Sequence, residues 1–194
     1  MNLYKVKVSE LTDLQEVKRI LRLTCNELDT LTEDFLFTYG GLSPELKNKC
    51  QYLSTLKSAL RVRCYELQDP IYSDGTIDLY HDDNNNFTIC ESGKKVPIGT
   101  IKYIETHNVV PGNISYQIYK PYQGHHYALR ALRIVGEQLL ENGIKQIYIT
   151  ATNNQNVPSI KTIEEFGGRL YKEEYKEMSG PVPYTCDLEE IYTK

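Results

Sequence analysis

The sequence predicts an α/β fold in which one mixed, mostly antiparallel sheet is flanked by helices within a single domain of residues 1–194. Its 194 residues, 40% hydrophobic and 25% charged, are ordinary for one soluble globular domain. Helical periodicity dominates the N-terminal third, and most of the short alternating segments typical of strands follow from Ile77 onward. Between residues 114 and 168 a strand, a helix, a second strand and a second helix follow one another.

The N-terminal third is predicted to contain one strand and two helices. Residues 3–8 alternate between apolar and polar side chains, which is typical of a strand. Apolar residues from Leu14 to Leu28 then fall near one face of a helix. Ser43 and Pro44 are suited to the cap and the first position of the next helix.

The middle of the chain is predicted to contain three short strands, at residues 77–80, 87–90 and 98–105. A polar loop, residues 81–86, separates the first two of these strands. It holds His81, Asp82 and Asp83, but no second ligand group lies at a recognisable spacing, so we expect no metal site there.

The segment from Asn113 to Gly168 organises the rest of the chain. A strand over residues 114–118 is followed by a polar turn, a helix over residues 128–140 and a second strand over residues 144–150. Asn156 is suited to cap the next helix, which Gly167 and Gly168 end. A helix N-terminus between two strands is a common binding place for the phosphates of a cofactor.

The C-terminal residues are predicted to return as two strands, residues 170–178 and 184–192, joined by a turn at Gly180 and Pro181. The first of them is unusually polar for a strand.

Two motifs carry a resemblance to a known family. The turn reads Gln123-Gly124-His125-His126-Tyr127-Ala128, and the later helix reads Asn156-Val-Pro-Ser159 with Glu164 and Gly167 downstream. Residues 96–178 thereby resemble the acetyl-CoA-binding core of the Gcn5-related N-acetyltransferase (GNAT) family, whose turn motif is Gln/Arg-x-x-Gly-x-Gly/Ala. The tail from Tyr171 onward is similar to an uncharacterised bacterial branch of that family.

The resemblance implies an N-acetyltransferase that moves an acetyl group from acetyl-CoA, its co-substrate, directly to a primary amine without a metal. It also implies that the strand at residues 113–119 splays from the next one and presents backbone amides to the pantetheine arm, while amides of the turn hold the pyrophosphate. The residues it implies for cofactor binding are Gln117, Ile118, Tyr119, Gln123, Gly124, His125, His126, Tyr127, Ala128, Asn156 and Ser159.

Two positions depart from the family pattern. His126 stands where the motif has its inner glycine, and it either crowds the phosphate site or contacts phosphate through its imidazole. Ile163 stands where many members carry a tyrosine that protonates the leaving thiolate.

The catalytic candidates are therefore sought elsewhere. An amine must lose a proton before it attacks, and Glu105, at the end of the strand before the splayed one, is the first candidate for the base. Tyr116 is the second. The alternative for Glu105 is a solvated strand-end carboxylate, which its position favours over catalysis, and the alternative for Tyr116 is a core-facing aromatic. Tyr119 and Tyr122 could replace the missing donor, and the sequence does not choose between them.

The composition of the chain limits which partners and which cellular compartment we expect. A net charge of −4 argues against nucleic acid, and no apolar run approaches a membrane span. Five scattered cysteines and an N-terminus without an apolar signal core favour the cytoplasm. We expect a small-molecule or peptide amine as the acceptor and consider a homodimer. The alternative function is a non-catalytic module of the same fold that binds or senses acyl-CoA.

Overall fold

The computed structural model describes residues 2–36, 43–82, 86–104, 113–176 and 180–193. The chain divides into two compact units, Met1–Asp69 and Pro70–Lys194, which are described separately.

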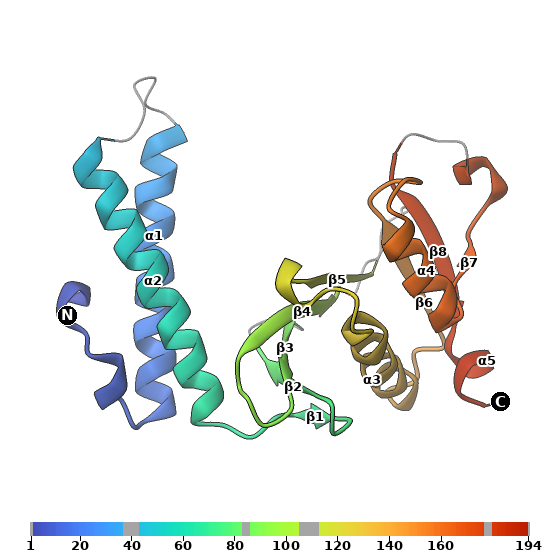
Figure 1. Cartoon of the computed structure of the whole chain (residues 1–194), viewed down its shortest axis with the longest axis horizontal. Helices are drawn as coiled ribbons and strands as arrows, with labels where there is room; N and C mark the ends of the chain where they lie inside the picture. The colour runs from blue at the N-terminus through green and yellow to red at the C-terminus, as the bar shows by residue number, and fades with distance from the viewer. Residues whose placement is uncertain (1, 37–42, 83–85, 105–112, 177–179, 194) are drawn as a thin grey trace. The chain divides into compact units, whose positions relative to one another are not determined.

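The first unit is a pair of long helices, α1 (Leu14–Leu36) and α2 (Pro44–Glu66), which run side by side (Figure 1). Ser43 caps α2 by accepting a hydrogen bond from the Leu46 amide, as the sequence predicts. Each helix turns an apolar stripe inward. The buried side chains with helical spacing are Val17 and Ile20 of α1 and Leu53, Leu56 and Leu60 of α2.

The strand predicted at residues 3–8 is wrong. The chain instead makes two 3-10 turns, η1 (Leu3–Lys5) and η2 (Val8–Glu10). These turns satisfy their own backbone groups, and the Tyr52 hydroxyl of α2 donates to the Leu3 carbonyl at 3.3 Å. Alternation alone did not make a strand because a strand needs a partner with which to share its hydrogen bonds.

The second unit is built on an eight-stranded sheet in the order β1-β2-β3-β4-β5-β6-β8-β7. Neighbouring strands are antiparallel except β5 and β6, which are parallel. The strands are β1 (Tyr72–Ser73), β2 (Ile77–His81), β3 (Asn86–Glu91), β4 (Pro97–Tyr103), β5 (Ile114–Ile118), β6 (Gln146–Ala151), β7 (Arg169–Leu170) and β8 (Val182–Asp187). The predicted mixed, mostly antiparallel α/β architecture is confirmed.

Helices α3 (Tyr127–Glu141), α4 (Val157–Phe166) and α5 (Leu188–Tyr192) belong to the same unit, with a 3-10 turn η3 (Lys120–Tyr122) before α3. The ends of the two longer helices follow the predicted signals. Gly143 past α3 and Gly167 past α4 both have positive φ, and Asn156 caps α4 by accepting from the Ser159 amide. The sequence therefore placed these helices correctly.

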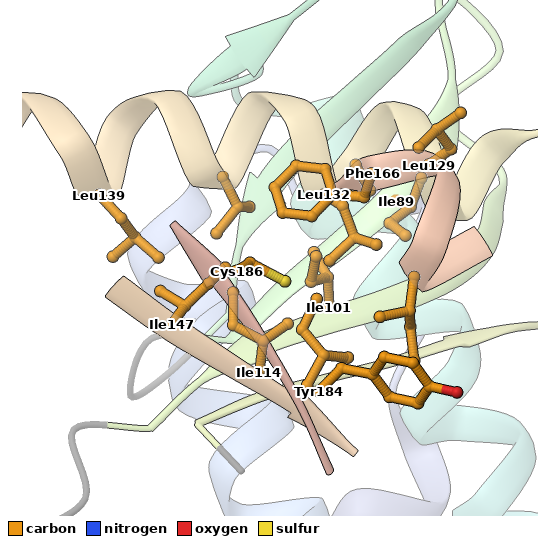
Figure 2. Close-up of a cluster of buried hydrophobic side chains, with 14 of the residues drawn as sticks. Ile89, Ile101, Ile114, Leu129, Leu132, Leu139, Ile147, Phe166, Tyr184 and Cys186 are labelled. Carbon is orange, nitrogen blue, oxygen red and sulfur yellow. The ribbon is translucent and has the colours of Figure 1, made fainter. Parts of the chain in front are cut away.

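One apolar cluster holds the sheet to α3 and α4. Figure 2 shows Leu129, Leu132 and Leu139 of α3 facing side chains that rise from the strands. Those strand residues include Ile101, Ile114, Ile147 and Cys186, and Phe166 closes the cluster from α4. The helical and strand periodicities of the second unit thus converge on one core.

The C-terminal predictions are partly wrong. Only the two residues of β7 form a strand in the segment predicted at residues 170–178, and a 3-10 turn, η4 (Glu173–Lys176), follows; residues 177–179 lie outside the described parts. The strand predicted at residues 184–192 stops at Asp187, whose carboxylate caps α5 by accepting from the Glu190 amide at 3.0 Å. Local capping ended the strand here because the aspartate satisfies a helix N–H.

Candidate functional site

The two parallel strands at the centre of the sheet separate soon after they meet. Strand β5 pairs with β6 at Ile114 opposite Ile149 only, and the Asn113 side chain accepts a hydrogen bond from the Tyr148 amide at 2.7 Å. The rest of β5 keeps its antiparallel pairing with β4 up to Ile118. The edge of β5 that faces β6 is therefore open beyond Ile114, in agreement with the expected splay.

The register fixes which amides face this opening. Tyr119 donates its amide to the Ile98 carbonyl at 2.9 Å, so residues 115, 117 and 119 are the hydrogen-bonded partners of β4. The alternate residues, Tyr116 and Ile118, direct their backbone N–H groups toward the opening. Of the three residues predicted to present amides, Ile118 fits, whereas the amides of Gln117 and Tyr119 face β4.

The turn before α3 has an unusual backbone. Gly124 has φ of 84°, and His126, the N-cap residue, has φ of 58° and ψ of 15°. A side chain with a Cβ is disfavoured in this left-handed region, so His126 occupies a position that favours glycine. The Gln123 side chain donates to the Ile118 carbonyl at 2.9 Å. Gln123 therefore fastens the turn to the open end of β5.

Two polar links hold the start of α3 to neighbouring hairpins. The Tyr127 hydroxyl donates to Glu91 Oε1 at 2.6 Å, and Arg130 pairs with Asp74 at 2.8 Å. The pKa of the Asp74 carboxyl is held below its usual value: burial raises it, but hydrogen bonds from the Ile77 amide, Arg130 and the Thr76 amide together outweigh burial. Neither link was predictable from the sequence, because the partners lie 36 and 56 positions apart in the chain.

Tyr116 and Ser159 join β5 to α4. Their hydroxyl oxygens lie 3.0 Å apart, and either can be the donor. Burial raises the pKa of the Tyr116 hydroxyl, against the opposing effect of hydrogen bonds to Ser159 and Thr162. The phenol is therefore held in its neutral form at physiological pH.

These parts surround a cleft of about 970 Å³. A volume near this size is typical of sites for large organic ligands. The residues that line it are Asn86, Thr100, Lys102, Ser115, Tyr116, Gln117, Ile118, Tyr122, Gln123, Gly124, His125, His126, Tyr127, Ala128, Thr152, Asn156, Pro158, Ser159, Lys161, Thr162 and Glu165.

The cleft brings together most of the site residues predicted from the sequence. Tyr119 is not among its lining residues, and Glu105 lies outside the described residues. Ile163 is fully buried in the core, so that position of α4 presents no group to the cleft. The sequence reasoning missed Thr100 and Lys102, although their alternation with buried Ile101 was a usable signal.

The His126 imidazole stays at the surface. Its side chain is 70% exposed, and Nδ1 lies 3.8 Å from Glu165 Oε2 of α4. The ring lines the cleft without filling it, and the unusual feature of His126 is its backbone.

A glycine-containing turn at the start of a helix, beside a strand whose edge is open, offers backbone N–H groups to an elongated ligand with phosphates. The sequence model of the family described as "Acetyltransferase (GNAT) domain" matches residues 63–169, more than half of the chain. This chain belongs to the GNAT family. Proteins of the family use acetyl-CoA as their co-substrate, and their common reaction is acetyl transfer.

Solved structures of several acetyltransferases are similar to this chain. One from Bacillus anthracis is 20% identical with a TM-score of 0.44, over 54% of this chain and 67% of that one. One from Agrobacterium tumefaciens is 18% identical with a TM-score of 0.44, over 52% and 58%. The microcin C7 self-immunity acetyltransferase MccE, solved with acetyl-CoA and AMP, is 12% identical with a TM-score of 0.41, over 91% and 89%.

The chain thus spans about two thirds or less of the length of the first two of these acetyltransferases. The family assignment rests on the sequence match, since the TM-scores lie below 0.5. A comparison with curated proteins found no match.

Two further observations concern other classes of site. Within the described ranges, no cluster of three or more His, Cys, Asp or Glu side chains is arranged to hold a metal ion. None of the helices in those ranges has both the length and the apolar character needed to cross a bilayer.

Proposed function

We propose that this GNAT protein transfers the acetyl group of acetyl-CoA directly to the primary amine of a small-molecule or peptide acceptor. The observation that carries the proposal is that the cleft is lined from both faces of the sheet. Tyr116 and Ile118 point to one face, and Ser115 and Gln117 point to the other, because side chains alternate along a strand. Two reactants can thus approach the open edge of β5 from opposite sides.

The residues on the helix side fit the co-substrate. The N–H groups of residues 124–128, with the positive end of α3, are suited to a pyrophosphate. The free amides of Tyr116 and Ile118 are suited to an extended amide-bearing arm, much as a neighbouring strand would pair with β5. Asn156 and Ser159 border the same side from α4.

When bound, acetyl-CoA supplies a thioester, whose carbonyl is open to attack by an amine. The protein's part is to hold both reactants in contact, which reduces the entropic cost of their encounter. An amide on the open edge of β5 can donate to the carbonyl oxygen and stabilise the charge that grows there. The amides of Ser115 and Gln117 are hydrogen-bonded to β4. The amides of Tyr116 and Ile118 face the opening and are therefore the ones that can take this role.

Tyr116 is better suited to giving a proton than to taking one. Its raised pKa disfavours the phenolate that a base would require, which argues against the base role assigned from the sequence. A neutral phenol beside the Ser159 hydroxyl can instead donate to a leaving thiolate. Since Ile163 is buried, this phenol takes over the role of the tyrosine that many family members carry on α4.

Glu105 is retained as the proposed base on sequence grounds alone. It follows directly after Ile104, the last described residue beyond β4. An amine is protonated at neutral pH, so a carboxylate or a water held by one must accept its proton before attack.

A second candidate function is binding of acyl-CoA without transfer. The observation that favours it is that Ile163 offers no proton donor and His126 replaces a glycine. The compartment we propose is the cytoplasm, because all five cysteines are free thiols. A homodimer remains part of the proposal.

Calorimetric titration with acetyl-CoA, followed by measurement of thiol release with a panel of primary amines, tests these functions. We expect micromolar binding and amine-dependent release of CoA. Binding with no release for any amine would favour the binding module. No binding at millimolar acetyl-CoA would reject both.

A further inference from the structure

The side of the cleft that the sheet forms is lined by polar side chains, and its charge is positive. Asn86, Lys102 and Ser115 lie opposite one another on β3, β4 and β5, so they share a face of the sheet. Thr100 and Gln117 form the neighbouring pair on that face. We call these five residues the sheet wall. Among them the only charged side chain is Lys102.

Lys102 is partly buried on the sheet wall and lines the cleft. Among the residues that the structure describes, its ammonium group has neither an ion-pair partner nor a hydrogen bond. The hydroxyls and amides around it can complete the coordination of an oxyanion, since they offer both donors and acceptors. A half-buried cation with such neighbours favours a negatively charged ligand group.

Two acidic groups among the described residues lie near the cleft, and neither forms an ion pair with Lys102. Glu165 lies on α4, close to His126 on the helix side. Asp82 lies opposite Asn86, on the side of Asn86 away from Lys102, because its amide donates to the Asn86 carbonyl. The backbone of Asp82 thus lies two strand spacings, about 10 Å, from the backbone of Lys102. The Asp82 carboxylate also accepts from the Thr88 hydroxyl at 2.7 Å.

We propose that the acceptor is a small primary amine that also bears an oxyanion, a carboxylate or a phosphate, which Lys102 contacts from the sheet wall. This inference rests on the proposed function, because the sheet wall is the acceptor side only if the co-substrate occupies the helix side. We expect polyamines and aminoglycosides to bind less tightly than such an amine. Their several ammonium groups would face Lys102, with no acidic side chain on the sheet wall.

The test measures binding of matched amines by calorimetry to the full chain saturated with CoA. The pairs are β-alanine with β-alaninamide and O-phosphoethanolamine with ethanolamine, and putrescine represents polycations. We expect at least one oxyanion-bearing amine to bind about tenfold more tightly than its partner that lacks the oxyanion, as is typical of one charge-assisted hydrogen bond. The matched pair that shows the preference identifies the oxyanion as a carboxylate or a phosphate.

Variants then assign the preference to Lys102. In Lys102→Gln the two amines of each matched pair should bind with affinities within about threefold of each other. Lys102→Arg should keep the preference for the oxyanion-bearing amine, because arginine keeps the positive charge. Lys145→Gln is the matched control: it removes the same charge at a surface pair with Glu189. If Lys102→Gln does not fold, the comparison of amines in the unmodified protein and in Lys102→Arg still decides.

Equal binding within both pairs, tighter binding of putrescine, absence of binding by every amine, or a preference that survives in Lys102→Gln would each overturn the inference. Thiol release in the same samples separates this outcome from the proposed function. Oxyanion-dependent binding without thiol release would reject transfer and leave the role of Lys102 standing. Thiol release that is greatest with putrescine would do the reverse.

Discussion

His126 adopts a left-handed backbone conformation that glycine would adopt at a lower free-energy cost. The turn needs a left-handed residue before α3, and His126 adopts that conformation with φ of 58°. A non-glycine residue in this region costs about 1–2 kcal/mol relative to one that adopts it freely. The two possibilities raised by the sequence, crowding of the phosphate site and contact with phosphate, therefore become separable by experiment.

We predict that His126→Gly raises the melting temperature slightly, while His126→Ala does not, because only glycine removes the backbone cost. Acetyl-CoA affinity separates the two roles of the imidazole. The ring is exposed and lines the cleft, so we expect both variants to bind about two- to tenfold more weakly, as after loss of one hydrogen bond to a charged group. Tighter binding by both variants would mean that the ring crowds the site.

Tyr116 is the second residue whose role can be isolated. We predict that Tyr116→Phe lowers the turnover number by about 10²-fold or more, in the range for loss of an acid catalyst, with acetyl-CoA affinity within about threefold. Steady-state kinetics with the best amine measures this, and calorimetry measures the affinity.

The matched control is Tyr119→Phe, one residue past the end of β5 and not among the residues that line the cleft. The pH profile adds a second check. Because burial raises the pKa of Tyr116, its contribution as an acid should persist as pH rises through the usual tyrosine value of about 10. Equal turnover of the two variants would contradict the assignment.

At the scale of elements, strand β5 depends on a glycine in its neighbour. A Cβ on Gly99 of β4 would lie 2.4 Å from the Gln117 carbonyl oxygen and 2.8 Å from the Ile118 side chain. Since the backbone of β5 cannot move freely, any side chain at Gly99 pushes the strand that carries the open edge.

We predict that Gly99→Ala lowers the free energy of unfolding by about 1–3 kcal/mol, as overpacking in a core does. It should also weaken acetyl-CoA binding, because Tyr116 and Ile118 would shift. Gly180→Ala is the control, since a Cβ there meets nothing within 4 Å. Urea unfolding of both variants checks the prediction, and similar midpoints would contradict it.

The link between Asp74 and Arg130 ties a hairpin to α3 and gives a pH dependence with a defined sign. The pKa of Asp74 is lowered in the folded protein, so its contribution to stability is present above the unfolded value of about 3.9 and is lost as pH falls through the folded value. The side chain is 25% exposed, so we expect a contribution of about 1 kcal/mol.

We predict that Asp74→Asn is less stable than the unmodified protein at pH 7 and that the difference narrows on acidification below about pH 4. Thermal unfolding across this range measures the difference. Asp29→Asn, an exposed position on α1, should show no such convergence. A constant difference from pH 7 to pH 3 would show that the carboxylate charge is not the cause.

At the scale of the molecule, the segment that matches the family model includes residues of both units. The match begins at residue 63, before the boundary between Asp69 and Pro70. We therefore predict that residues 1–194 unfold as one cooperative domain, and that acetyl-CoA at about 100 times its dissociation constant stabilises it by about 2.7 kcal/mol.

Differential scanning calorimetry with and without acetyl-CoA measures this. One transition that moves to higher temperature is the expected result. Two transitions, of which only one responds to acetyl-CoA, would mean that residues 1–69 form an independent domain.

Local signals determined much of this protein from its sequence. Ser43, Asn156, Gly143 and Gly167 fixed helix ends because capping uses groups within one turn of the chain. The turn motif at residues 123–128 and the splay of β5 were foreseen through the family resemblance. The strand predicted at residues 3–8 was wrong because a strand needs a distant partner, and the strand predicted at residues 184–192 ended early because Asp187 caps a helix.

Only the tertiary structure decided which groups face the cleft. The direction of the Tyr116 and Ile118 amides follows from the register between β4 and β5, and the contact of Tyr116 with Ser159 joins residues 43 positions apart. Lys102 became a candidate because Asn86 and Ser115 flank it on neighbouring strands. A sequence encodes caps and periodicities through near neighbours, whereas a binding site is made by hydrogen bonding and packing between distant ones, which the folded chain alone specifies.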